Sequence, residues 1–442
     1  MAIQLSDHFD YKKLLRFCIP SIIMMVFTSI YGVVDGLFVS NFVGKTAFAA
    51  VNLVMPFIMV LGGVGFMIGT GGSALVACTL GEGDKARANR YFTMMVWLTL
   101  VLGLALSAFG IAFMGPISQL LGAEGAMLED CVLYGRLVLA FNTAFMLQNV
   151  FQSFFITAER PGLGLAATVA AGLTNMVLDA VFIAGFGWGV AGAALATGVS
   201  QCVGGLLPLA YFVRPNKSLL RLTRCRLQAR PVLKACANGS SELMSNISSS
   251  LVSMLYNLQL LRLAGQDGVA SYGVLMYVQF VFVAMFIGYS IASAPIVSYH
   301  YGAANRREMN NLLTKSLKLM ALAGAAMLAA AQLLARPMAG VFVGYDAQLM
   351  EMTAHGFRVF AFSFVFTGVN IFASSFFTAL NNGAVSAAIS FLRTLVFQLL
   401  AVLILPVFWG LDGVWLAITV AEVCALVLSA AFLLAMRRRY GY

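Results

Sequence analysis

The chain alternates between long apolar runs and short polar segments. Most runs exceed the roughly 20 residues that an α-helix needs to cross a hydrocarbon core of about 30 Å. Polar residues do not recur at every second position, as they would in a barrel strand, and helices satisfy their own backbone groups in lipid. We predict an all-α polytopic membrane protein with twelve transmembrane helices, at about 14–40, 52–77, 91–114, 132–157, 163–184, 188–213, 233–263, 272–299, 315–335, 355–380, 384–407 and 413–436.

Composition agrees with a chain whose solvent is lipid. Hydrophobic residues make up 61% of the 442 positions and charged residues 10%, whereas a soluble domain is about half apolar and about a quarter charged. The first run is too long for a signal-peptide core and lacks a small-residue cleavage site, so we expect it to remain as a helix. Four cysteines lie inside apolar runs and are expected to be small buried hydrophobic residues: Cys18, Cys78, Cys202 and Cys424.

The net charge of +10 comes from basic residues in the short segments between the runs. In a soluble protein this charge would suggest nucleic acid, but membrane topology explains it here, and we expect no nucleic-acid partner. Basic residues flank both termini and follow the second, sixth and eighth predicted helices, whereas the other loops carry acids such as Glu124 and Glu351. The positive-inside rule then places both termini in the cytoplasm of a cell with this protein in its plasma or inner membrane.

The two halves of the chain resemble each other at an offset of about 221 positions. Four segments match in one order: 43–51 with 264–272, 80–85 with 301–306, 152–155 with 374–377, and 189–192 with 410–413. Each half holds six predicted helices, and an even number returns the chain to the same side, so the repeats are parallel.

This repeat predicts three parts. They are an N-terminal six-helix lobe at 1–213, a basic cytoplasmic linker at 214–232 and a C-terminal six-helix lobe at 233–442. The linker has six basic residues and no acid between 214 and 230, so we expect it on the cytoplasmic lipid surface. Two such lobes would flank a central cavity and open it to each face in turn; the alternative is a duplicated bundle without transport.

No ATP-binding loop is apparent in the sequence. Gly44-Lys45-Thr46 resembles the end of a phosphate loop, but Val39 stands where the first glycine would be. The three histidines are far apart in the sequence and predict no metal site. We therefore expect no cofactor, and an ion gradient or the substrate's own gradient as the source of energy.

Carboxylates inside predicted helices are the main chemical clue, because a charge in lipid is unfavourable. Asp35 and Asp179 each lie about five residues from the outer end of a helix, so their depths match. Asn175 lies one turn before Asp179 on the same face. Asn149 and Thr197 add polar groups at similar depth. Two carboxylates in a dry bundle repel, so the pair would bind a proton, or Na⁺ within an oxygen shell; alternatively, each acid only accepts a hydrogen bond from a neighbour.

Other polar and aromatic residues suggest contacts with cargo. Glu242 lies in the inner part of the seventh helix, where it either binds cationic cargo or pairs with the basic rim. Met276, Tyr277 and Phe280 are candidates to line a soft cavity for flat organic cations, although most such side chains face lipid or the core. Arg393 lies near the cytoplasmic end of its helix and is expected to snorkel to the surface.

Several segments resemble the multidrug and toxic compound extrusion (MATE) family. Segments 158–161, 175–179 and 185–197 are similar to the family signature that spans helices four to six. Val33-Val34-Asp35-Gly36, after Pro20, is similar to its helix-one motif, and the basic loop at 81–90 also fits. The resemblance covers nearly the whole chain.

The resemblance implies an antiporter that exports small organic cations or drugs in exchange for H⁺ or Na⁺. By motif position it implies a cation-coupling site made of Asp35, Asn149, Asn175, Asp179 and Thr197. The one candidate metal ion is Na⁺, bound at the two aspartates. Some Na⁺-coupled members carry an aspartate on helix ten, but 360–380 has no acid here, so coupling should rest on the N-terminal lobe. We expect the lipid bilayer and the cargo as partners, and function as a monomer.

Two other functions stay open. A flippase for lipid-linked oligosaccharides of the same superfamily would favour basic residues in the membrane, because its cargo is anionic. A channel or a membrane-embedded enzyme belongs to another class, but no His-Glu or Ser-His-Asp constellation supports an enzyme, and the parallel duplication favours alternating access over a pore.

The topology is directly testable. Single cysteines at positions 221 and 437 should react with an impermeant thiol reagent only after cells are opened, whereas a cysteine at position 124 should react in intact cells. Labelling of position 221 but not position 124 in intact cells would reverse the orientation.

Overall fold

The structure is a computed structural model that describes residues 3–216, 218–344 and 346–442, and every regular element in these ranges is helical. The first half contains α1 (Tyr11–Phe38), η1 (Val39–Val43), α2 (Lys45–Gly81), α3 (Lys85–Leu120), α4 (Gly125–Ala140), α5 (Asn142–Thr157), α6 (Pro161–Asp179), η2 (Ala180–Gly185) and α7 (Gly189–Val213). The second half contains α8 (Ala229–Gly302), α9 (Arg306–Val343), α10 (Ala347–Phe360), η3 (Ala361–Ser363), α11 (Phe364–Ala379), α12 (Gly383–Phe391), η4 (Leu392–Phe397) and α13 (Gln398–Tyr440).

Most of these helices suit a membrane. Within the described ranges, 9 helices are long and apolar enough to cross, or 10 if α4 and α5, which meet at 53°, form one broken span. Two helices are much longer than one crossing and are kinked, α8 at Gly265 (φ 61°) and α13 at Gly410 (φ 54°). The 74 residues of α8 would extend roughly 110 Å if straight, so each half is long enough to cross by itself.

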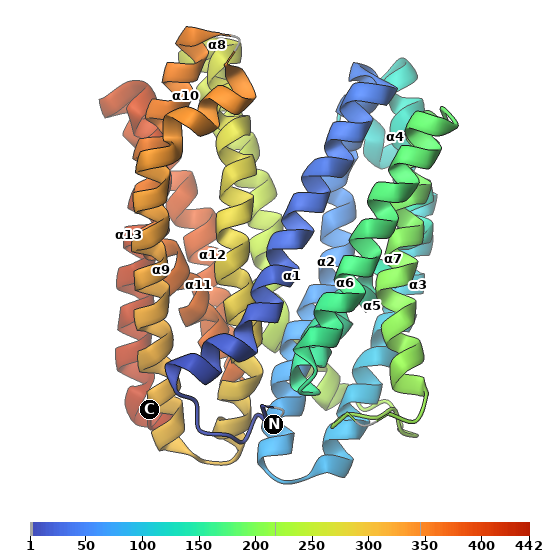
Figure 1. Cartoon of the computed structure of the whole chain (residues 1–442), viewed down its shortest axis with the longest axis vertical. Helices are drawn as coiled ribbons and strands as arrows, with labels where there is room; N and C mark the ends of the chain where they lie inside the picture. Colours follow the sequence, from blue (N-terminus) through green and yellow to red (C-terminus); the bar gives the residue numbers. More distant parts are fainter. Residues whose placement is uncertain (1–2, 217, 345) are drawn as a thin grey trace.

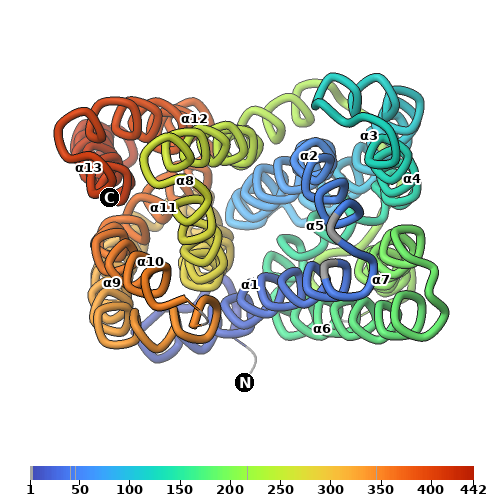
Figure 2. The backbone as a smooth tube through the Cα atoms, turned by 90° about the horizontal axis from the view of Figure 1, so that it is seen from above, coloured from blue at the N-terminus to red at the C-terminus, as the bar shows by residue number. Residues whose placement is uncertain are grey.

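The helices form two groups (Figure 1). We call α1–α7 the N-terminal bundle and α8–α13 the C-terminal bundle. The two bundles lie close together at the end that holds both termini and diverge toward the other end. Viewed from above, α1 runs from beneath the C-terminal bundle to the far side of the N-terminal bundle (Figure 2).

Glycines allow the two bundles to meet at the convergent end. A Cβ atom on Gly81 of α2 would lie 2.0 Å from the carbonyl oxygen of Tyr299 on α8. Reciprocally, a Cβ atom on Gly302 would lie 2.0 Å from the carbonyl oxygen of Cys78. The hydroxyl of Ser298 also donates a hydrogen bond of 2.6 Å to the carbonyl of Ala74. Small residues therefore bring the two backbones into direct contact, as in other membrane helix pairs.

The N-terminal segment, residues 3–10, joins the bundles at the same end. The Leu5 N–H donates to a carboxylate oxygen of Glu159, in the turn between α5 and α6, at 2.8 Å. The Phe9 N–H donates to Glu308 of α9 at 3.0 Å, and Asn311 donates to the Phe9 carbonyl at 3.0 Å. Both Leu5 and Phe9 are fully buried. Burial raises the pKa of the Glu159 carboxyl, although the Leu5 N–H acts in the opposite direction.

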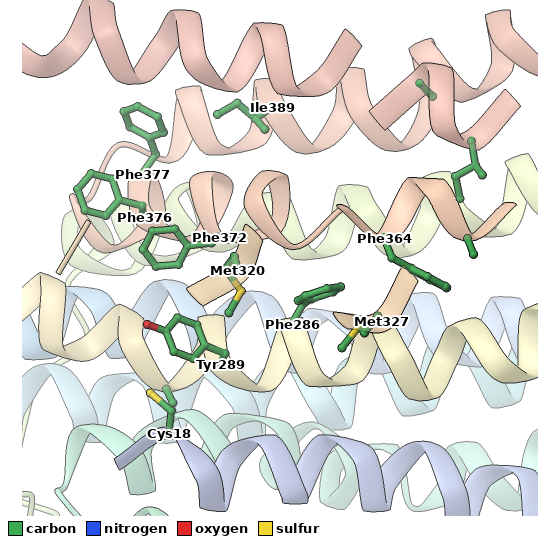
Figure 3. Close-up of a cluster of buried hydrophobic side chains, with 14 of the residues drawn as sticks. Cys18, Phe286, Tyr289, Met320, Met327, Phe364, Phe372, Phe376, Phe377 and Ile389 are labelled. Atoms are coloured by element: carbon green, nitrogen blue, oxygen red, sulfur yellow. The ribbon is translucent and has the colours of Figure 1, made fainter. Parts of the chain in front are cut away.

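An aromatic and aliphatic core holds the C-terminal bundle together (Figure 3). Phe286 of α8, Met320 and Met327 of α9, and Phe364 and Phe372 around α11 are all buried in one cluster. Residues of α1, including Leu14, Phe17 and Cys18, belong to the same cluster. The first half of α1 is thus part of the core of the bundle opposite to its own.

The cysteines behave only partly as expected. Cys18 and Cys78 are buried, but Cys202 is half-buried and Cys424 is exposed on the outer surface of its helix. The prediction of burial was wrong for Cys424, because an apolar run in a membrane protein presents one face to lipid as well as one to the core.

The glycine contacts predict a stability difference. Gly302→Ala and Gly81→Ala each place a methyl group against a carbonyl oxygen, and overpacking of this kind costs about 1–3 kcal/mol. We expect both variants to unfold several degrees below the wild type when purified in detergent. Gly273→Ala is the matched control, because nothing lies within 4 Å of its added Cβ. Equal unfolding temperatures for the three variants would contradict the close contact.

Candidate ion-coupling site

The structure brings two buried carboxylates together in the N-terminal bundle. Asp35 lies on α1 and is 9% exposed, and Asp179 is the last residue of α6 and is 0% exposed. Their carboxyl groups lie within hydrogen-bonding reach of each other. Two carboxylates can share such a contact only when a proton or a cation lies between them, because both oxygens are otherwise acceptors.

Irregular turns mark the helices that carry the pair. The π-helical turn η2 begins directly after Asp179, and η1 begins four residues after Asp35. A π-helical turn inserts one residue per turn into the backbone ladder and is frequent at functional sites. Here it separates each aspartate from the end of its helix.

Five side-chain oxygens of the predicted site residues are buried without a partner among the described residues. Both carboxylate oxygens of Asp179, one of Asp35, the amide oxygen of Asn175 and the hydroxyl of Thr197 are buried and have no hydrogen-bond partner in the described part of the chain. Buried polar atoms are normally paired, so this gathering of oxygens fits a site for a small hard cation or a proton. Within the same ranges, no three His, Cys, Asp or Glu side chains cluster as a metal site.

Tyr134 of α4 is a neighbour of the site that the sequence did not reveal. Its side chain is fully buried, its hydroxyl has no partner among the described residues by strict geometry, and it points toward Thr197. Nothing in the sequence separates Tyr134 from the other tyrosines. By contrast, the sequence does indicate that Tyr31 lies near the site, because it precedes Asp35 by four residues on the same helical face.

Asn149 is buried, and its amide contacts the backbone of α2. Its amide donates to the carbonyl of Gly62 on α2 at 3.5 Å. Neither Asp35 nor Asp179 appears among its hydrogen-bond partners in the described residues. This hydrogen bond joins α5 to α2, and the part of Asn149 in ion coupling stays a prediction.

The expected cargo residues do not gather in one place. Met276 packs against the core of the C-terminal bundle, Tyr277 stacks on Phe342 of α9 at 6.3 Å between ring centroids, and Phe280 is 63% exposed. The carbonyl of Phe280 accepts a 3.4 Å hydrogen bond from Ser29 of α1. Of the three, Phe280 alone lies beside the opposite bundle.

Acidic and basic groups are paired inside the C-terminal bundle. The Nε atom of Arg393 donates to Glu422 at 2.9 Å, and Asn370 donates to the same carboxylate at 2.7 Å. Arg393 therefore does not snorkel to the surface, since its buried partner on α13 holds it inside. The sequence analysis missed Glu422, although it is an acid inside a predicted helix. Glu242 is half-buried, lies in the field of Arg393 and has no ion pair in the described ranges.

Comparisons with known proteins find relatives along nearly the whole chain. The MatE family model matches residues 20–181 and 243–403 of the chain. The multidrug export protein MepA of Staphylococcus saprophyticus is 23% identical over 94% of this chain and 92% of its own length. MepA of Staphylococcus haemolyticus is 22% identical over 97% and 94%.

Solved structures share the fold over the whole chain. The outward-facing conformation of a multidrug resistance MATE family transporter of the MOP superfamily has a TM-score of 0.92 and 25% identity, and covers 100% of this chain and 98% of that one. A crystal structure of MATE in complex with MaL6 has a TM-score of 0.92 and 24% identity, and covers 98% and 97%.

The helical fold and the buried carboxylate pair define a multi-pass membrane transporter. The matched segments cover more than half of the sequence, and the chain belongs to the MatE family of multidrug efflux transporters.

Tyr134 generates a prediction for this site. We expect Tyr134→Phe to weaken binding of Na⁺ or a proton by at least about tenfold, because the unpaired hydroxyl is free to bond to the ion or to its carboxylates, and a hydrogen bond to a charged group contributes about 1.5–3 kcal/mol. The fluorescence of Trp188, which stacks on Phe182 of η2 at 4.9 Å between ring centroids, reports on the site during titrations. Tyr256→Phe is the control, since its buried hydroxyl also has no partner among the described residues but belongs to the other bundle. Identical titrations of Tyr134→Phe and wild type would remove Tyr134 from the site.

Proposed function

We propose that this protein is a secondary active antiporter that exports organic cations or drugs from the cytoplasm in exchange for H⁺ or Na⁺. The observation that carries the proposal is the contact between Asp35 and Asp179, with unpartnered oxygens around it. In lipid such a pair is stable only when an ion neutralises it. A site that changes its charge during each cycle is what coupling to an ion gradient requires.

The path of α1 supports a physical link between ion binding and movement. Its second half carries Asp35 in the N-terminal bundle, while Cys18 in its first half is packed in the core of the C-terminal bundle. Pro20 lies between the two. Proline removes a backbone hydrogen bond and weakens the helix at that place. Repacking of Asp35 after ion binding therefore acts on both bundles, with Pro20 as the place where α1 bends.

We further propose twelve transmembrane helices in two parallel six-helix repeats, joined by the linker at 214–232. The kinks in α8 and α13 support this count, because each divides one long helix into two spans. Residues with positive φ support the repeat, since they recur at offsets of 221 or 222 positions: Gly44 with Gly265, Gly83 with Ala304, Glu159 with Asn381, and Gly189 with Gly410. The reciprocal contacts of Gly81 and Gly302 are also what a two-fold axis between repeats would produce.

The basic segments favour cytoplasmic termini, as proposed from the sequence. With that orientation the convergent end of the bundles is the cytoplasmic end, and the conformation faces outward. The likeness to an outward-facing MATE transporter supports this assignment.

Charge balance favours cationic cargo. Exposed basic residues lie near the ends of the predicted helices, as Arg136, Arg262 and Arg358 do. Of the charges deeper in the helices, Arg393 is neutralised by Glu422, whereas Asp35, Asp179 and Glu242 have no ion pair in the described part of the chain. The remaining charge is therefore acidic. A flippase for anionic lipid-linked sugars would need the opposite balance, so we keep it as the weaker alternative. The relatives named multidrug export protein support drug-like cargo.

Removal of either carboxylate tests the coupling. Asp35→Asn and Asp179→Asn keep nearly the same shape, so we expect normal expression and insertion. Efflux of a fluorescent cationic dye, driven by an imposed H⁺ or Na⁺ gradient across vesicles, should fall at least about tenfold, because the variant cannot change its charge with the ion.

Asp267→Asn is the matched control, since this exposed aspartate lies in α8 two residues after the kink at Gly265. If both site variants retain wild-type efflux under the gradient, the coupling site lies elsewhere and Glu242 becomes the leading candidate.

A further inference from the structure

A cavity of about 530 Å³ lies outside the carboxylate site, between the start of α3 and the linker at 214–228. The linker runs at the end of the molecule that holds both termini (Figure 1). Four arginines line it: Arg87 and Arg90 from α3, and Arg224 and Arg226 from the linker.

The linker is fixed against α3 by its backbone. The Arg221 N–H donates to the side-chain oxygen of Asn89 at 2.9 Å, and the Thr223 N–H donates to the hydroxyl of Thr93 at 3.0 Å. Leu220 is fully buried beneath this stretch. Residues 220–223 are thus docked on α3, and this docking brings Arg224 and Arg226 to the same cavity as Arg90.

The cavity carries an excess of positive charge. Arg87 is paired with Glu82 and with Asp84, the latter at 3.5 Å. The other three arginines have no ion pair in the part of the chain that the structure describes. Three like charges around one cavity repel one another unless an anion lies between them. The planar guanidinium group is suited to phosphate oxygens, which it can bind with two parallel hydrogen bonds.

The exposed surface of α3 next to the cavity indicates that the phosphate group belongs to a lipid. Trp97, Val101 and Leu104 follow Arg90 by 7, 11 and 14 positions, so they lie on the same helical face as Arg90. These three apolar side chains are 55%, 54% and 65% exposed. A ligand with a phosphate head at the arginines and an acyl chain along this stripe would cover both features. Tryptophan is also typical of the level of lipid headgroups.

We propose that the cavity binds the phosphate headgroup of an anionic phospholipid, with an acyl chain on the stripe of Trp97, Val101 and Leu104. The lipid joins α3 of the N-terminal bundle to the linker that leads into α8. It therefore stabilises the connection between the two bundles. This inference does not depend on the coupling ion or on the cargo.

Binding is measured on the purified full chain in a neutral detergent. Phosphatidylglycerol should raise the unfolding temperature of the wild type, whereas phosphatidylcholine should not. The triple variant Arg90→Gln, Arg224→Gln, Arg226→Gln should bind phosphatidylglycerol roughly a hundredfold more weakly, because three basic contacts to an anionic lipid are lost. The control Arg307→Gln, Arg438→Gln, Arg439→Gln removes the same charge from exposed positions at the same end, and its affinity should stay within about threefold of wild type.

A second measurement uses the wild-type protein alone. Cys225 lines the cavity, so phosphatidylglycerol should slow its reaction with maleimide, as resolved by mass spectrometry, but leave half-buried Cys202 unaffected. Equal stabilisation of both triple variants by phosphatidylglycerol, or no protection of Cys225, overturns the proposal. Protection by inorganic phosphate at the same concentration as the lipid would also overturn it, because the site would then take a free anion.

Discussion

A charge inside a bilayer needs a counter-charge, and the two bundles of this protein meet that requirement in different ways. In the C-terminal bundle, Glu422 has a resident partner in Arg393 and a hydrogen bond from Asn370. In the N-terminal bundle, Asp35 and Asp179 contact each other and have no basic partner in the described chain. The Glu422–Arg393 pair is neutral by itself, whereas the Asp35–Asp179 pair is neutral only when it binds a proton or a cation. On this difference we base the proposal that ion coupling belongs to the N-terminal bundle, because the C-terminal pair is already neutral.

The helix α1 converts that local difference into a property of the whole molecule. It is packed in the C-terminal core at Cys18 and carries Asp35 in the opposite bundle. A change of charge at Asp35 is therefore expected to alter the packing of α1 around Cys18. The backbone contacts at Gly81 and Gly302 keep the convergent end closed while this happens, since nothing larger than a hydrogen atom fits there.

Much of the helical architecture could be predicted from the sequence, because lipid forces apolar runs into helices. The runs about 233–263 and 272–299 correspond to the two halves of α8, although no feature of the sequence predicts one continuous element through Gly265. The proximity of Asp35 and Asp179 followed from matching depth. Tyr134 could not be found, because its place depends on how α4 packs on α7. Met276 was chosen for its chemistry, and chemistry alone does not tell which face of a helix it occupies.

The hydrogen bonds of residues 3–10 oppose separation of the two bundles at the convergent end, and they therefore affect the equilibrium between conformations. Leu5 is held by Glu159 and Phe9 by Glu308 and Asn311, so the bundles cannot part at the convergent end unless contacts to one of them break. If each bond contributes about 1 kcal/mol, release of the single Leu5–Glu159 bond leaves roughly one molecule in six in the alternate state when nothing else favours the closed one. Residues 3–10 thus bias the resting population toward the conformation in which the convergent end is closed, and an extension fused ahead of the chain would change the rate of the transport cycle without altering the ion site.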